Sequence, residues 1–407
     1  MFKKYIQPIE TRKSVYFNVL AGSVFTSLNQ VTDEDFNTGK IVNITQSPRW
    51  FNKEANPYIY DPHVLVSSAH YSGVKDLRAK MKADDDTIIF VDSGGFQLAT
   101  GVKPKHTREK ALIWSETNGN IFPILDLPAN TKFSLQDSID FSVESAKYYA
   151  DNRTNHDCTI MNVLSAKDYN GMEKWYNAIK DFPFDGWCYG GHGNFLKSII
   201  QSILFLEMKG EFKKTSNLHM FGTTSLSIIP YIIYAQYLLN QKGIDCQLSF
   251  DSSYAFTYAG YGKYFIFPSF KGMSALIISN KYDWSGLSEF SHFGCDCPVC
   301  QGVTDVKKLF DGSMGSHFYS IIGIHNYIMI ARFKEIIEGL LSMNIPCTDN
   351  DHGIFESLPT EMKNNFKYMR EAFDVMGKKG INIINDKFAN SVVKKGLVNK
   401  KISSFFG

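Results

Sequence analysis

The sequence lacks an excess of charge of either sign and lacks a long apolar run. The net charge of the 407 residues is +2, so binding of a nucleic acid would have to depend on a local basic patch. The longest apolar stretch, at 225–240, contains Pro230 and is too short to span a bilayer. No signal-peptide pattern begins at Met1. We therefore expect a soluble, cytoplasmic protein, in a bacterial cell or a phage-infected host.

Cysteine is also scarce, which argues against a disulfide framework and fits a reducing compartment. Three of the seven cysteines stand close together in a C-x-C-x2-C pattern. With one histidine they would complete a tetrahedral zinc shell without an open position, which is typical of structural Zn²⁺. The expected ligands are Cys295, Cys297, Cys300 and His325, with His292 and His317 as competing choices for the histidine. The chemistry is then expected elsewhere in the chain.

Short apolar runs bounded by turn residues alternate with segments of helical spacing, and this predicts a (β/α)8 TIM barrel. The runner-up is an open, doubly wound α/β sheet. The predicted strands are 87–92, 121–126, 159–164, 186–190, 218–222 and 247–251, with two more near 14–24 and 264–278. The predicted helices include 134–150, 169–179, 196–208, 228–241 and 361–376.

The expected organisation has three parts. Residues 1–284 form the catalytic barrel, 285–335 a zinc-binding subdomain packed on it, and 336–407 a helical extension with a basic tail. The lysines at 394, 395, 400 and 401 favour a solvated face, with phosphate binding as the alternative.

Three carboxylates follow predicted strands, and in a parallel barrel such positions meet at one mouth. Asp92 ends one strand and Asp251 another, and two acids at one mouth suit a displacement in which one attacks an anomeric carbon and the other handles a proton. Asp126 is the third. The alternative role of each residue is that of a helix cap or turn former.

Glycines and aromatic residues accompany these acids. Gly94 permits close approach of a ligand to the backbone, and Phe96 offers a flat face to a ring. Gly190 and Gly191 precede His192 at another strand end, where backbone groups could bind a heterocycle or a phosphate. A tyrosine-rich run at 254–264 suits base stacking, although ordinary packing would also explain it.

In this order, the motifs resemble the guanine transglycosylase superfamily, which consists of zinc-containing TIM barrels that exchange guanine for a 7-deazaguanine in a nucleic acid. The resemblance covers about residues 60–335 and runs through VDSGGFQ at 91–97, LDLP at 125–128, GG at 190–191, LHMFG at 218–222, FDSSY at 250–254 and the zinc set ending in His325. It implies that Asp251 is the nucleophile, which forms a glycosyl-enzyme intermediate, and that Asp92 is the general acid/base. The implied substrate-binding residues are Ser93, Gly94, Phe96, Asp126, Ser165, Gly190, Gly191 and Tyr254.

Departures from the family pattern favour a DNA enzyme. Bacterial tRNA enzymes follow the nucleophile with Pro-Thr-Arg, whereas this chain has Ser-Ser-Tyr at 252–254, which is more like the archaeal type. Residues 336–407 show no archaeal RNA-binding domain. This combination looks most like the DNA-guanine transglycosylases of bacterial and phage DNA-modification systems. Ser165 stands where the family usually has Gln, which leaves open how the base is held.

We therefore expect a pentosyltransferase that inserts a free base such as 7-cyano-7-deazaguanine into DNA without ATP or a redox cofactor. The alternatives are a tRNA-guanine transglycosylase and a non-catalytic subunit of a heteromeric enzyme. Zn²⁺ is the expected cofactor. A homodimer and accessory modification proteins remain open as partners.

Overall fold

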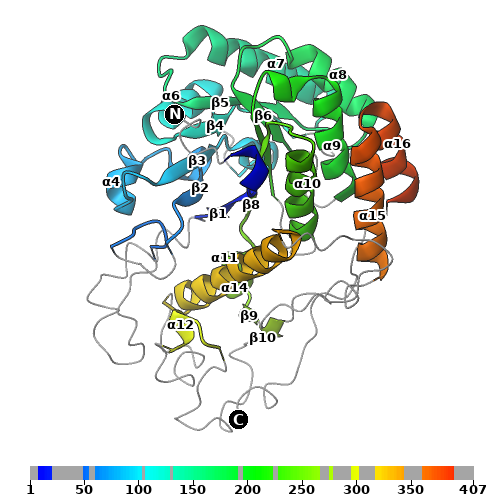
Figure 1. The fold of residues 1–407 in the computed structure, drawn as a ribbon. Coiled ribbons are helices and arrows are strands. Elements are labelled where there is room, and N and C mark those ends of the chain that lie inside the picture. Colours follow the sequence, from blue (N-terminus) through cyan, green and yellow to red (C-terminus); the bar gives the residue numbers. More distant parts are fainter. Residues whose placement is uncertain are drawn as a thin grey trace.

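A computed structural model describes residues 8–20, 49–54, 60–102, 106–128, 132–190, 196–222, 228–265, 275–277, 295–301, 317–342 and 360–388. Within these residues, eight parallel strands close into a barrel that is surrounded by helices (Figure 1). The strands follow each other in chain order, and the last strand pairs with the first. The predicted (β/α)8 barrel is confirmed, and the open doubly wound sheet is excluded.

The barrel strands are β1 (Val15–Val19), β2 (His63–Ser67), β3 (Ile88–Asp92), β4 (Ile121–Pro123), β5 (Thr159–Leu164), β6 (Gly186–Tyr189), β7 (Asn217–Met220) and β8 (Gln247–Ser252). Every residue of β5, β6 and β8 is buried. Such burial on both faces is what parallel strands covered by helices require, and it explains why these segments are nearly continuous apolar runs.

The six strands expected at 87–251 and the one near 14–24 are confirmed, but the eighth prediction was wrong. Residues near 264–278 contain β9 (Lys263–Phe265) and β10 (Ala275–Ile277), which form a separate antiparallel pair. The remaining barrel strand is β2, which the sequence reading missed. Its run is His-Val-Leu-Val-Ser, with a serine rather than a carboxylate at its end.

The predicted helices are confirmed as α7, α8, α9 and α10, which follow barrel strands, and α15, which follows α14. The described α-helices are α3 (Ser68–Tyr71), α4 (Leu77–Met81), α5 (Gly95–Ala99), α6 (Arg108–Asn118), α7 (Leu135–Asn152), α8 (Tyr169–Ile179), α9 (Leu196–Met208), α10 (Ile229–Gln241), α11 (Tyr254–Gly260), α12 (Pro298–Gln301), α14 (His317–Ser342), α15 (Thr360–Val375) and α16 (Gly377–Lys387). Short 3-10 turns occur at η2 (Ile9–Thr11) and η3 (Glu211–Lys213). None of the described helices has the length and apolar character needed to cross a membrane.

The long helix α14 lies against the outside of the barrel near the β1–β8 seam (Figure 1). Its Tyr327 ring lies 6.0 Å from the ring of Tyr16 on β1, which in turn stacks on Phe250 of β8 at 5.2 Å. The boundary expected between 335 and 336 falls inside this helix. The metal-bearing segment and the start of the carboxyl-terminal extension therefore share one continuous helix.

Helices α15 and α16 extend the outer layer beside α9 and α10. Phe366 packs on Tyr231 of α10 with ring centroids 5.0 Å apart. Asn385 of α16 accepts hydrogen bonds from Lys197 and Gln201 of α9 at 2.8 and 2.5 Å. The described part of the carboxyl-terminal extension is thus helical and packed on the barrel.

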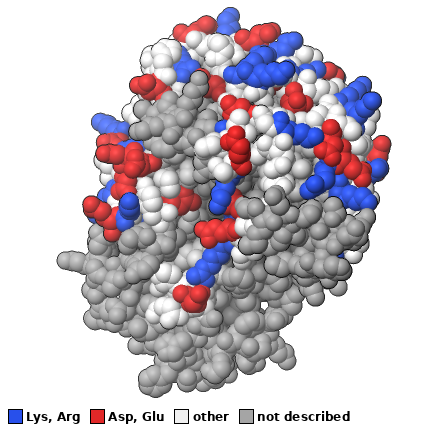
Figure 2. All heavy atoms as spheres, viewed as in Figure 1, with Lys and Arg blue, Asp and Glu red and all other residues white. Residues whose placement is uncertain are grey.

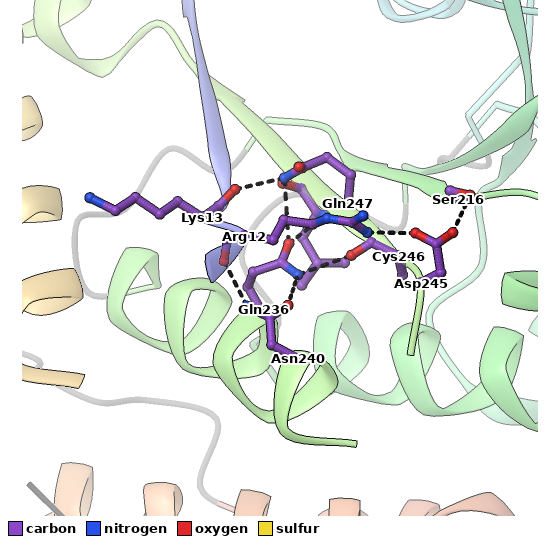
Figure 3. Close-up of polar contacts among 9 residues, drawn as sticks. Arg12, Lys13, Ser216, Gln236, Asn240, Asp245, Cys246 and Gln247 are labelled. Atoms are coloured by element: carbon purple, nitrogen blue, oxygen red, sulfur yellow. Dashed lines mark hydrogen bonds and ion pairs between the residues drawn. The ribbon is translucent and has the colours of Figure 1, made fainter. Parts of the chain in front are cut away.

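The end of the barrel where the strands begin is closed by a polar network (Figure 3). Arg12 donates to Asp245 at 2.8 Å, which joins the segments that precede β1 and β8. Gln247 donates to the carbonyl of Lys13, and Asn240 donates to that of Arg12, each at 2.7 Å. At this end, Arg12 pairs with an acid and the two side-chain amides donate to backbone carbonyls. These contacts stabilise the fold.

Candidate functional site

Three carboxylates stand at the opposite end of the barrel, where the strands end. Asp92 is the last residue of β3, Asp251 is the fifth residue of β8, and Asp126 lies just past β4. The three carboxylates also interact with one another. Besides burial, the charge of Asp251 raises the pKa of Asp92, and the charge of Asp92 raises that of Asp126. The buried Cys188 thiol on β6 has its pKa raised by burial and by all three acids. One mouth therefore contains all three predicted carboxylates.

Asp251 is buried and is held by two donors. Its Oδ1 accepts from the backbone N–H of Gly222 at 2.9 Å, and Nε2 of His219 lies 3.2 Å from the same oxygen. Both donors come from β7 or the residues directly after it. The carboxylate is thus fixed in orientation by the neighbouring strand.

Asp92 is partly buried and carries a perturbed pKa. Burial raises the pKa of this carboxyl to about 6, against the opposing effect of the Ser67 hydroxyl and with a further rise from the charge of Asp251. Ser67 is the register partner of Asp92 across the β2–β3 pair. A carboxyl with this pKa can both hold and release a proton near neutral pH.

Asp126 is 7% exposed, and burial followed by the charge of Asp92 raises its pKa to about 7. The backbone of α5 approaches it closely. A Cβ atom added at Gly95 would lie 2.6 Å from Oδ1 of Asp126 and would also meet its backbone carbonyl. Gly95 is therefore required for the contact between α5 and Asp126, a purpose that the sequence reading did not assign.

The loop that follows Asp92 is held by buried polar residues. Both Ser68 and Nε2 of His106 donate to the carbonyl of Ser93, at 2.8 and 2.7 Å. Gly94 has φ of 87°, and a Cβ there would lie 2.6 Å from that of Ala69. The fixed turn places α5 at the mouth, with Phe96 on it 65% exposed.

Ser165 and Gly190 lie side by side after β5 and β6, where the Ser165 hydroxyl donates to the carbonyl of Gly190 at 3.2 Å. A Cβ at Gly190 would be 3.4 Å from that hydroxyl oxygen, so the two residues are in close contact. Gly191 and His192 lie outside the described residues, as do the lysines at 394–401.

Tyr254 begins α11, three residues after Asp251. Its ring lies 3.8 Å from that of Tyr258 and 5.3 Å from that of Phe265, and it is only partly exposed. The Lys263 ammonium lies 4.5 Å from the centre of the Tyr258 ring. Packing within this group thus uses much of the Tyr254 side chain, while Tyr261, further along, is 69% exposed.

A second candidate site is the group Cys295, Cys297, Cys300 and His325, whose ligand atoms all lie within 4.8 Å of one another and could hold a metal ion. Nδ1 of His325 is 3.8, 3.4 and 3.2 Å from the three Sγ atoms in chain order. A tetrahedral Zn²⁺ with usual bond lengths would separate N and S by about 3.5 Å. His292 and the His317 side chain lie outside the described part of the chain.

Neighbouring groups orient His325 for metal binding. Nε2 of His325 donates to the carbonyl of Phe265 at 2.7 Å, which leaves Nδ1 as the ligand atom facing the sulfurs. The Tyr264 ring stacks on the imidazole at 3.8 Å and 5°, and its hydroxyl is 3.0 Å from Sγ of Cys300. The donor set and its neighbours therefore fit a metal.

The metal group is connected to the strand of Asp251. Asn326, next to His325, donates to the carbonyls of Ala255 on α11 and Lys263 on β9, at 3.0 and 2.9 Å. The Tyr16 hydroxyl donates to the carbonyl of Ser252 at 3.1 Å. The segment directly after Asp251 is thus tied to α14.

The residues that sequence reasoning missed support the carboxylates from other segments. Ser67 on β2 is the register partner of Asp92, and His219 on β7 contacts Asp251. His106, before α6, holds the loop after Asp92 through the Ser93 carbonyl. Only LHMFG at 218–222 carried a signal, because it was part of the family resemblance, but it gave His219 no role.

On the face in Figure 2, the Lys and Arg residues of the described surface are interspersed with Asp and Glu.

No protein-family model matches the chain, and no curated protein matches it. Among solved structures, it is similar to an N-acetylneuraminate lyase from Fusobacterium nucleatum, at 9% identity over 93% of this chain and 98% of the other, with a TM-score of 0.32. A likeness at this level does not bear on the activity. The barrel fold itself is typical of enzymes.

Proposed function

We propose that this protein is a pentosyltransferase that replaces guanine in DNA with a free 7-deazaguanine base, such as 7-cyano-7-deazaguanine. The observation that carries the proposal is the group of three electrostatically coupled carboxylates at one mouth, two of them with raised pKa values. Coupled acids whose environments differ can divide the roles of nucleophile and proton carrier.

In the first step, an Asp251 oxygen attacks C1′ of the target nucleotide, and the C1′–N9 bond of guanine breaks. The electron pair goes to N9 of guanine, and the proton that neutralises the leaving base comes from Asp92. In the second step, N9 of the incoming base gives its proton to Asp92 and attacks C1′, which releases Asp251. Two displacements retain the configuration at C1′ and return both acids to their starting states.

The pKa of about 6 suits Asp92 to this double role, because both protonation states are accessible near neutral pH. Asp126, with Ser93 beside it, would bind the polar edge of the base, and Gly190 and Ser165 would border the same pocket. The exposed Phe96 ring offers a stacking surface for a nucleotide that has left the duplex.

The choice of DNA rests on the sequence, where Ser-Ser-Tyr at 252–254 replaces the Pro-Thr-Arg segment that grips tRNA in bacterial relatives of this type. The metal is proposed to be Zn²⁺ in a structural role. Cys295, Cys297, Cys300 and His325 would hold it, and it would stabilise the segment that follows Asp251 rather than take part in the exchange.

One experiment tests the proposal. The purified protein is incubated separately with duplex DNA, single-stranded DNA and tRNA, each with radiolabelled guanine or with 7-cyano-7-deazaguanine followed by nucleoside analysis. Exchange into DNA but not tRNA is expected. Exchange into tRNA alone would replace the substrate assignment, and absence of exchange that a partner protein restores would favour the subunit alternative.

A further inference from the structure

The two oxygens of Asp251 are in different environments. Oδ1 accepts from the Gly222 N–H at 2.9 Å and faces Nε2 of His219 at 3.2 Å. Among the described residues, no hydrogen bond reaches Oδ2. Hydrogen bonds from two donors engage the lone pairs and the negative charge of Oδ1, whereas the lone pairs of Oδ2 remain available to attack.

His219 is itself fixed by its neighbours. It is fully buried, and its Nδ1 lies 2.9 Å from the Oγ atom of Ser249, its register partner on β8. An ionised Asp251 carboxylate only accepts hydrogen bonds, so Nε2 of His219 must carry a hydrogen, and the carboxylate selects that tautomer. The Ser249 hydroxyl can then donate to Nδ1 and complete the hydrogen bonds of the ring.

Aromatic rings hold the imidazole in place. Phe90 on β3 stacks on it with ring centroids 4.1 Å apart at 29°. Phe17 and Phe221 contact it edge to face, at 5.8 and 4.9 Å. The ring therefore cannot swing away without disturbing the interior of the barrel, and its Nε2 hydrogen points steadily at Asp251.

We infer that His219 is a positioning residue for the exchange reaction. Together with the Gly222 N–H it holds Oδ1 of Asp251, so that Oδ2 is the oxygen that bonds to C1′, and Ser249 helps to fix the imidazole by its contact with Nδ1. The inference rests on the proposed function, since it assigns a task within the same displacement.

A matched pair of variants separates hydrogen bonding from packing. The side-chain amide of His219→Gln can place a donor near the position of Nε2 but loses the ring, whereas His219→Phe keeps a ring against Phe90 but has no donor. We expect kcat to fall roughly ten- to a hundredfold more in His219→Phe than in His219→Gln, with little change in KM. Circular dichroism and thermal denaturation establish that both variants are folded.

Trapping of the covalent intermediate provides a second readout. Under single-turnover conditions, the rate of formation of the protein–DNA adduct should fall in His219→Phe and be partly retained in His219→Gln. Parental kcat in His219→Phe, or a larger loss in His219→Gln than in His219→Phe, would overturn the inference.

Nuclear magnetic resonance tests the hydrogen bonds without reference to activity. In ¹⁵N-histidine-labelled protein, the signals of His219 are those missing from His219→Gln. They should report hydrogen on Nε2, and Ser249→Ala should change the chemical shift of Nδ1 while the hydrogen stays on Nε2. An Nδ1-protonated tautomer in the parent would refute the inference, whereas failure of the parent to exchange any base would refute the proposed function and leave the tautomer result standing.

Discussion

The two ends of the barrel differ in the arrangement of their charged groups. Where the strands begin, Arg12 meets Asp245, and the amides of Gln247 and Asn240 meet backbone carbonyls. Where the strands end, carboxylates lie close enough to raise one another's pKa. The ion pair and hydrogen bonds at the first end stabilise the fold. The repulsion between carboxylates at the second end opposes folding, but it leaves acids with raised pKa values at the mouth. This contrast helps to locate the chemistry in a barrel from the arrangement of its charged groups.

The largest effect is expected from Asp251→Asn, which should remove activity without loss of stability. The amide cannot attack C1′, so exchange should fall by roughly four orders of magnitude or more. Stability should hold or increase, because a charge that opposes ionisation of Asp92 is gone. Labelled-base incorporation and thermal denaturation measure the two effects. Incorporation at the parental rate would show that the nucleophile has been assigned wrongly.

Removing the metal should loosen the mouth more than the opposite end. Asn326 is next to the ligand His325 and donates hydrogen bonds to the carbonyls of Ala255 and Lys263. Without the metal, His325 is held less firmly, so these hydrogen bonds should weaken. After treatment with a chelator, hydrogen exchange should speed up in α11 and β9 but not in the amides near Arg12 and Gln247. We expect activity to fall about tenfold or more and to return with Zn²⁺.

Cys300→Ser serves as the matched variant for metal removal and should reproduce these effects without a chelator. Hydrogen exchange that rises equally at both ends of the barrel would show that the metal supports the whole fold rather than the mouth.

The pH dependence of stability should also distinguish the two ends. Burial raises the pKa of folded Asp126 to about 7, above its value in the unfolded chain, so the folded state binds more protons between about pH 4 and pH 7. The stability of the parent should therefore decline as the pH rises through that window. Asp126→Asn should be more stable than the parent by about 1–3 kcal/mol at pH 8, with the difference vanishing near pH 4.

Urea denaturation at several pH values measures this difference. A constant difference between Asp126→Asn and the parent at all pH values would mean that Asp126 is not protonated more readily in the folded state.

The smallest effect is expected where opposite charges meet. Asp245→Ala removes a partner of the buried Arg12 side chain, but Asp245 itself is 52% exposed, so the loss of stability should be only about 1 kcal/mol. Exchange per folded molecule should not change. The surface pair Lys242–Asp374 provides the control, and Asp374→Ala should cost about 0.5 kcal/mol or less.

Much of the fold was predictable because buried parallel strands are apolar on both faces. This held for β3, β5 and β8, whose runs end in or near polar residues. It failed for β2, although its three central residues are apolar and buried, and for the segment around β9 and β10, which form an antiparallel pair outside the barrel. Apolar runs indicate burial but do not say which sheet a strand joins.

The carboxylates were predictable for the same reason, since residues at the ends of parallel strands meet at one edge. Their partners were not predictable. The pairing of Ser67 with Asp92 and of His219 with Ser249 depends on the register between neighbouring strands, which no local pattern in either strand encodes.

The pairing of β8 with β1 has a consequence for synthesis of the chain. Arg12 and Asp245, which join these two strands at their start, are 233 positions apart in sequence, so the barrel cannot close until nearly two-thirds of the protein has left the ribosome. Until then β1 has only β2 beside it, and one edge of the growing sheet stays open. The proposed nucleophile therefore reaches its place in one of the last steps of assembly, and a nascent chain that stalls before β8 would be both inactive and prone to aggregate.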